Sequence, residues 1–283
     1  MWRSRANLQS RPCLTLYYNA LLPSATICFA LSTVEKVAIK ESTLERVHRA
    51  RSVFVLTGAG VSAESGVPTF RGGGGATVWK GMPFEVISSA AMIERDLVAV
   101  WEWFDYRREL LRNLKPNPAH TTLARWGRKY ERFTLATQNI DGLHAAAGSE
   151  NVLELHGTIW KARCLRCDAR KSLRREERAD DSRRERPPLC EVCGEAMRPD
   201  VVLFGEMLSD KVLERAAEAA EGCDICFVIG TSGVVYPAAG LAEIAKGAGA
   251  FVIEINPERT ALSDVCDETI QGRAGEILPQ LRV

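Results

Sequence analysis

The chain has 283 residues, of which 46% are hydrophobic and 26% charged, and its formal net charge is +1. This is the composition of an ordinary globular protein, long enough for one large domain with a smaller insert. The balanced charge argues against nucleic acid and membrane surfaces as general partners. Nine cysteines, with four in two Cys-x-x-Cys pairs, favour a thiolate metal site over a secreted disulfide framework and indicate a reducing, cytoplasmic setting.

The first 34 residues differ from the rest of the chain. They contain three arginines and no acidic residue, and an apolar stretch over Leu14–Leu31 is too short and too mixed for a transmembrane helix. We interpret residues 1–34 as an extension outside the fold, either disordered or not native to the protein. A targeting signal is the alternative interpretation.

Strands and helices are predicted to alternate from residue 41 onward. The spacing of Leu44, Val47 and Ala50 predicts a helix over 41–50. It is followed by short apolar runs typical of buried parallel strands, with helical segments between the later ones. The predicted strands are 52–57, 133–137, 225–230 and 251–255, and the predicted later helices are 211–221 and 238–246. This order predicts an α/β fold, a Rossmann-like doubly wound parallel sheet that binds ligands at the carboxyl ends of its strands.

Two stretches interrupt the alternation. Residues 74–118 have a helical apolar stripe, and residues 161–198 are polar, rich in arginine and carry the paired cysteines. We predict that they form a smaller zinc-binding and helical domain over the sheet, with the active-site cleft between the two. The arginines are interpreted as a solvated surface, with partner binding as the alternative. The predicted division is 35–73, 119–160 and 199–283 for the Rossmann-like domain, 74–118 for the helical module and 161–198 for the zinc-binding module.

Four cysteines form the predicted metal site. They are Cys164, Cys167, Cys190 and Cys193. Two Cys-x-x-Cys units about twenty residues apart are typical of tetrahedral zinc, and four thiolates leave no position for water, so the site is predicted to be structural. A third pair, Cys223 and Cys226, is interpreted as core packing because Cys226 opens an apolar strand; redox or metal chemistry is the alternative.

A glycine turn follows the first predicted strand. Gly58 and Gly60 allow close backbone approach, and the helix that follows can direct its free amides at a phosphate group. A purely structural turn is the alternative. With Ala63 at the third position, the string is also compatible with a dehydrogenase fingerprint.

Three strings, taken together with the cysteine pairs, carry a family resemblance. Gly58–Gly72, Gln138–His144 and Glu154–Gly157 resemble the corresponding motifs of the sirtuins, which are NAD-dependent protein deacylases. The resemblance extends over roughly Val37 to Leu281. It implies two cofactors, NAD and zinc, and acyl-lysine proteins as substrates. The oligomeric state cannot be read from the sequence, and a monomer is favoured.

The resemblance implies a set of residues that contact NAD. Phe70 would shield the ribosyl carbon, Arg71 would help to hold the cofactor, and nicotinamide would lie near Asn139 and Asp141. A structural role at a strand end is the alternative for the polar residues after the second strand. The full set is Gly58, Ala59, Gly60, Ser62, Phe70, Arg71, Gln138, Asn139, Ile140, Asp141, Gly230, Thr231, Ser232, Asn256, Pro257, Glu258 and Ala274.

His156 and Asn139 are the implied catalytic residues. Histidine titrates near neutral pH, which suits a general base. In the sirtuin reaction the acyl oxygen attacks the ribosyl carbon of NAD and nicotinamide leaves. The histidine then deprotonates a ribose hydroxyl, and water completes the release of lysine and O-acyl-ADP-ribose. The other histidines are interpreted as surface (His48), helix capping (His120) and structural (His144).

The resemblance also implies how a substrate is held. Val201, Val202, Phe204, Gly205 and Val234 would pair their main chain with the peptide as an added strand, which predicts weak sequence preference.

The acyl group would meet residues of the helical module. Class III sirtuins, which this chain resembles, recognise acidic acyl groups with a Tyr-x-x-Arg pair. Here the pair reads Phe104-x-x-Arg107, so the arginine is kept and one hydroxyl is lost. Such a hydrogen bond to a charged group contributes about 1.5–3 kcal/mol, which predicts deacetylation with reduced removal of succinyl and malonyl groups. A core phenylalanine beside a solvated arginine is the alternative for this pair.

Two other functions are alternatives to deacylation. A sirtuin-like mono-ADP-ribosyltransferase would use the same cleft, and a zinc-ribbon module would bind nucleic acid through its arginines. The second leaves Gly58 and His156 unexplained, and no aromatic platform accompanies the arginines.

Overall fold

The structure is a computed structural model that describes residues 39–68, 78–173 and 186–283. The predicted extension over 1–34 lies outside the described residues. Among the helices within the described ranges, none is long and apolar enough to cross a membrane.

The elements follow the order expected for an α/β protein. In chain order they are α1 (Glu41–Arg49), β1 (Ser52–Thr57), α2 (Gly60–Ala63), β2 (Val78–Trp79), β3 (Met82–Pro83), α3 (Phe84–Ile87), α4 (Ala90–Arg95), α5 (Leu97–Arg112), α6 (Pro118–Trp126), β4 (Arg132–Thr137), α7 (Leu143–Ala146), β5 (Leu153–Glu154), β6 (Gly157–Cys164), β7 (Arg170–Ser172), β8 (Met197–Val201), α8 (Asp210–Glu221), β9 (Ile225–Ile229), α9 (Gly240–Gly247), β10 (Phe251–Asn256), β11 (Glu268–Gln271), α10 (Ala274–Ile277) and the 3₁₀ helix η2 (Leu278–Leu281).

Six strands form a parallel sheet in the order β11-β10-β9-β1-β4-β5. Every residue of β1 is buried, as expected for a parallel strand covered on both faces. In the register, Thr57 of β1 lies beside Thr137 of β4 and Ile229 of β9. Three central strands therefore end together, and the loops that follow them meet at one edge of the sheet.

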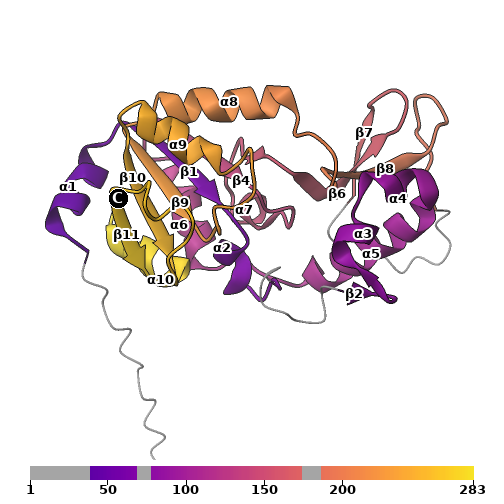
Figure 1. Ribbon diagram of the computed structural model, residues 1–283, viewed down its shortest axis with the longest axis horizontal. Helices are drawn as coiled ribbons and strands as arrows, with labels where there is room; N and C mark the ends of the chain where they lie inside the picture. The colour runs from indigo at the N-terminus through magenta and orange to yellow at the C-terminus, as the bar shows by residue number, and fades with distance from the viewer. Residues whose placement is uncertain (1–38, 69–77, 174–185) are drawn as a thin grey trace, which may run out of the picture. The chain divides into compact units, whose positions relative to one another are not determined.

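Helices cover both faces of this sheet. On one face, Val55 and Phe227 pack with Trp126 of α6 and Ile277 of α10; on the other, alternate strand residues such as Phe54 pack with α8 and α9. Figure 1 shows α8 and α9 together on one side of the strands, with α6 and α10 on the other. The predicted Rossmann-like doubly wound α/β class is confirmed.

A three-stranded antiparallel sheet, β7-β6-β8, carries the cysteine pairs. It has a small core of its own, formed by Trp101 of α5 with Ala162, Cys164, Cys190 and Met197. Cysteine and alanine supply most of this core, which is why residues 161–198 show no apolar pattern. The predicted boundaries at 160/161 and 198/199 fall inside β6 and β8, and the division into domains stays a prediction.

Candidate active site and metal centre

The glycine turn after β1 packs directly against the turn after β9. Gly60 N donates to Gly230 O at 2.7 Å, and Gly58 N donates to Ile229 O at 3.0 Å. A Cβ at Gly58 would lie 2.7 Å from the Cβ of Thr231, and one at Gly230, where φ is +59°, would lie 2.4 Å from Val61 N. This close approach requires glycine whether or not a ligand binds. The role of Gly58, Ala59 and Gly60 in holding phosphate stays a prediction.

The loop after β4 connects three strand ends. Asn139 Nδ2 donates to Gly58 O at 3.0 Å and to Ser62 Oγ at 3.1 Å, and Gln138 Nε2 donates to Thr231 Oγ1 at 3.0 Å. Five of the predicted cofactor residues are thus linked by side-chain hydrogen bonds at the carboxyl edge of the sheet, with Asn139 held by two acceptors.

The same loop continues into a buried turn. Asp141 is buried, and its Oδ1 accepts a hydrogen bond from Leu143 N at 2.8 Å, which starts α7. Its carbonyl accepts from Trp160 Nε1 at 2.6 Å, and the Ile140 carbonyl accepts from Ile159 N at 3.1 Å. These contacts tie the predicted nicotinamide end of the cleft to β6.

Two buried histidines lie beneath this loop and were not assigned to the site from sequence. His120 and His144 have ring centroids 4.8 Å apart, and burial lowers their pKa to about 4 and about 3, so both are neutral at physiological pH. His120 Nδ1 accepts from Asn117 N, as predicted for a helix cap, so its Nε2–H donates to Ser62 Oγ at 3.3 Å. No spacing in the sequence signals this contact.

His156 follows β5 and is held in a single tautomer. Its Nδ1 lies 2.9 Å from the carbonyl oxygen of Gln138. Because a carbonyl can only accept, Nδ1 carries the proton and the lone pair of Nε2 is left to accept one. Burial lowers the pKa of His156, and the bond to Gln138 opposes that shift. The arrangement therefore presents a neutral imidazole base beside the β4 loop.

The residues predicted around the adenosine lie at the ends of β9, β10 and β11. Asn256 ends β10, and its Nδ2 lies 3.5 Å from Thr231 O; Gly272 N donates to Asn256 O at 3.1 Å. Ser232 directly follows Thr231. Pro257 and Glu258 are exposed, whereas Ala274 is buried and starts α10. Phe70 and Arg71 lie outside the described residues.

The predicted substrate segment, residues 201–205, connects His156 to the helical module through main-chain hydrogen bonds. Val202 N donates to His156 O at 2.9 Å. Phe204 N donates to Ser88 O at 2.9 Å, and the Phe204 carbonyl accepts from Ala90 N at 3.0 Å. Val201 is buried, whereas Phe204, Gly205 and Val234 are exposed. Within the described residues, β8 is an edge strand of its three-stranded sheet.

Phe104 and Arg107 lie on the buried side of α5. Phe104 is 2% exposed and packs in a core with Val67 and Leu143. Arg107 is 5% exposed, and its guanidinium lies 5.6 Å from the Trp103 ring centroid, so the arginine is not solvated. Burial lowers the pKa of Arg107, opposed by nearby Tyr106 and Asp141. Contact with an acyl group stays a prediction.

The four cysteines converge at one point. Their sulfur atoms all lie within 4.8 Å of one another; Cys164 Sγ is 3.4 Å from Cys193 Sγ, and Cys167 Sγ is 3.6 Å from Cys190 Sγ. Tetrahedral zinc with bonds of about 2.3 Å places its ligands about 3.8 Å apart, so the residues fit a closed zinc site.

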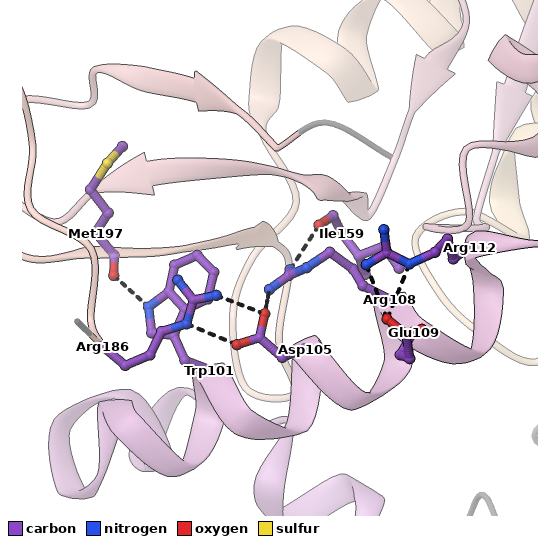
Figure 2. A network of polar contacts seen from close by, with 8 residues as sticks. All are labelled: Trp101, Asp105, Arg108, Glu109, Arg112, Ile159, Arg186 and Met197. Carbon is purple, nitrogen blue, oxygen red and sulfur yellow. Dashed lines mark hydrogen bonds and ion pairs between the residues drawn. The ribbon is translucent and has the colours of Figure 1, made fainter. Parts of the chain in front are cut away.

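A polar network joins α5 to the cysteine-bearing module (Figure 2). The Asp105 carboxylate accepts from Arg186 Nε at 2.8 Å and also pairs with Arg108. Both guanidinium groups lie over the ring of Trp101, at 4.9 Å for Arg186 and 5.2 Å for Arg108, and Trp101 Nε1 donates to Met197 O at 2.8 Å. The helix that carries Phe104 is thereby anchored to the metal centre.

We expect Gly157→Ala to destabilise the site next to His156, the predicted catalytic residue. Gly157 has φ of +72°, and a Cβ there would lie 2.1 Å from Asp200 O. The left-handed backbone costs about 1–2 kcal/mol for alanine, and forcing β6 and β8 apart adds about 1–3 kcal/mol. Gly148→Ala is the matched control, because Gly148 has φ of +87° with nothing within 4 Å. If urea unfolding shows that Gly157→Ala and Gly148→Ala lose the same free energy of unfolding, the predicted clash is contradicted.

Comparison with known proteins agrees with the geometry. The pattern of the Sir2 family matches residues 58–237. An NAD-dependent protein deacylase 2 of Pyrobaculum aerophilum is 48% identical over 231 residues, 82% of this chain and 90% of the relative. An NAD-dependent protein deacylase of Thermococcus kodakarensis is 44% identical over 234 residues, again 82% and 90%.

Solved structures give the same result. A Sir2 homologue in complex with NAD is similar with a TM-score of 0.77 at 40% identity, covering 86% of this chain and 93% of that chain. A mutant Sir2 homologue in complex with 2′-O-acetyl ADP ribose has a TM-score of 0.76 at 39% identity, covering 86% and 95%. The predicted resemblance is confirmed, and the chain belongs to the Sir2 family.

Proposed function

We propose that this protein is an NAD-dependent protein-lysine deacylase. The observation that carries the proposal is His156, fixed as a neutral base by the Gln138 carbonyl beside the loop that joins the glycine turn. Relatives named as NAD-dependent protein deacylases, and solved relatives with NAD or 2′-O-acetyl ADP ribose, support it. NAD supplies the ribosyl group that accepts the acyl group. With water, the products are free lysine, nicotinamide and O-acyl-ADP-ribose.

In this proposal the proton moves through His156 Nε2. Nδ1 is already protonated toward Gln138, so only Nε2 can take a proton from a ribose hydroxyl. Asn139 and Asp141 receive the nicotinamide end. Because the Asn139 amide is fixed by Gly58 and Ser62 before any ligand arrives, little side-chain freedom remains to be lost on binding. The contributions of Phe70 and Arg71 rest on the family resemblance alone.

The substrate peptide would pair with Val201, Val202, Phe204, Gly205 and Val234. Two observations support this: β8 lies at a sheet edge, and Val202 is bonded to the His156 carbonyl. Main-chain pairing at this edge would deliver an acyl-lysine to the histidine with little dependence on flanking sequence. We also propose a reducing compartment, such as the cytoplasm, because four thiolates must stay unoxidised to hold zinc.

The test is release of nicotinamide from NAD in the presence of acetyl-lysine and succinyl-lysine peptides, with mass spectrometry of the peptides. We expect turnover of the acetyl peptide. If NAD is cleaved while neither peptide loses its acyl group and protein becomes ADP-ribosylated, the protein is a mono-ADP-ribosyltransferase instead.

We expect Phe104→Tyr to raise kcat/KM for a succinyl-lysine peptide by about tenfold or more. The added hydroxyl supplies a hydrogen bond to the acyl carboxylate beside Arg107, and such a bond contributes about 1.5–3 kcal/mol. Tyr106→Phe is the matched control, because Tyr106 is exposed and stacks on Trp103 at 5.9 Å. Equal changes toward acetyl and succinyl peptides would show that Phe104 only fills the core.

A further inference from the structure

A partly buried ion pair joins the two ends of the predicted substrate segment. The Arg198 guanidinium contacts both carboxylate oxygens of Glu206, with Nη2 to Oε2 at 2.9 Å. Arg198 is 5% exposed and the side chain of Glu206 is 20% exposed. The two residues lie at either end of a short stretch of chain, so their pairing fixes the distance between its ends.

Both charged groups also bind the main chain between them. Arg198 Nη2 donates to Val201 O at 2.9 Å, and Nε donates to Pro199 O at 3.3 Å. Glu206 Oε2 accepts from Leu203 N at 2.8 Å. Burial raises the pKa of Glu206, but the bonds from Arg198 and Leu203 outweigh it and the pKa is lowered, so the carboxylate stays ionised. A buried pair of this kind contributes little net stability, but it can select one backbone conformation.

The enclosed segment supports the catalytic histidine. Val202 N donates to His156 O, and Asp200 O lies against Gly157, where a Cβ would come within 2.1 Å. At its other end, Phe204 exchanges main-chain hydrogen bonds with Ser88 and Ala90. A shift in this segment therefore moves the groups that would pair with a peptide and the main chain of His156 together.

We propose that Arg198 and Glu206 are positioning residues, which hold residues 199–205 in the conformation that accepts an acyl-lysine peptide. The inference rests on the proposed deacylase function, and it goes beyond it by assigning peptide affinity to one buried and one partly buried side chain that do not touch the substrate. Loss of either partner leaves the other charge without its counter-ion. It also releases main-chain bonds, two for Arg198 and one for Glu206, so the segment relaxes.

The test uses Glu206→Gln and Arg198→Lys in the full-length protein. Glutamine keeps the size of Glu206 but not its charge, and lysine keeps the charge of Arg198 but not the planar fork that bonds several oxygens at once. We expect each variant to weaken binding of a fluorescent acetyl-lysine peptide by about tenfold or more. Affinity for NAD should stay within about twofold, because the strand-end loops that bind it are not bonded to this pair.

Glu102→Gln is the matched control, since Glu102 pairs with Lys80 at 2.7 Å on the surface of α5 and should leave peptide affinity unchanged. Peptide binding that is unchanged in both variants overturns the proposal. So does a parallel loss of peptide and NAD affinity, which marks a merely structural pair. Wild-type protein that binds the peptide without consuming it would refute the deacylase function but leave this inference standing, because the readout is binding.

Discussion

Replacement of His156 by alanine is expected to lower kcat for deacylation by about 10²–10⁴-fold, the usual contribution of a general base. NAD and peptide affinity should change little, because the contact that fixes this side chain is to the Gln138 carbonyl, whereas peptide pairing involves main chain. His48→Ala is the matched control: His48 is exposed and its ring bonds the Arg282 carbonyl at 2.9 Å. Loss of the acyl group from the peptide, followed by mass spectrometry under saturating substrates, measures the effect, because nicotinamide leaves before His156 acts. A variant that retained more than about a tenth of the rate would remove His156 from this role.

The pH profile provides a second readout of the same residue. Burial lowers the pKa of His156, and its bond to Gln138 only partly opposes this. The neutral base therefore persists below the ordinary histidine range near 6.5 and is lost only as the pH falls through the lowered pKa. We expect kcat to be flat through neutral pH and to fall on the acid side. A rate that rises with pH well above 7 would require a different base.

The central strands of the sheet were predictable because each is a short apolar run covered on both faces. Residues 52–57 are β1 without any shift of boundary, and 251–255 became β10 with one residue added. Such strands can be recognised in the sequence without knowing which strands they pair with, because a strand buried on both faces is a nearly continuous run of apolar residues. The strand-end positions of Asn139, Thr231 and Asn256 follow from the same rule.

The smaller part of the structure was less predictable, because its stability depends on contacts between distant residues. Arg186 binds Asp105 across 81 residues, and Trp101 fills a core whose other members come from β6, β8 and the second cysteine pair. Neither contact produces a hydrophobic periodicity or a motif spacing that could be recognised in the sequence. The His120–Ser62 contact is of the same kind, which is why a buried histidine next to the predicted cofactor residues looked like an ordinary helix cap.

Loss of the metal is expected to unfold the cysteine-bearing module while leaving the six-stranded sheet folded. Among the described residues, the core that this module forms with Trp101 of α5 has five buried members, and two of them, Cys164 and Cys190, are predicted ligands. So little apolar surface cannot offset the entropy of ordering the chain. Binding a structural zinc ion contributes about 10–16 kcal/mol in small zinc peptides, so here the metal supplies most of the folding free energy.

Cys167→Ser tests this with little disturbance of packing, because Cys167 is exposed. We expect the purified variant to lose its equivalent of zinc, measured by elemental mass spectrometry, and to become sensitive to protease within 161–198. Cys223→Ser is the matched control: Cys223 lies in the sheet core and its Sγ donates to the Ala220 carbonyl at 3.1 Å, a bond that serine can keep. Zinc retained at full occupancy by Cys167→Ser would contradict a four-thiolate site.

Metal removal should affect α5, the predicted acyl-binding helix, but not NAD binding. Trp101 packs in the core that holds the ligands, and Phe104 and Arg107 follow it on α5 within two turns. When that core loosens, Trp101 loses its fixed environment and α5 loses its anchor through Asp105. The near-ultraviolet circular dichroism should therefore fall, and peptide KM should rise, on metal removal. NAD affinity should persist, because the glycine turn is held by the ends of β1, β4 and β9 within the six-stranded sheet. Parallel loss of both affinities would show that the two parts fold as one unit.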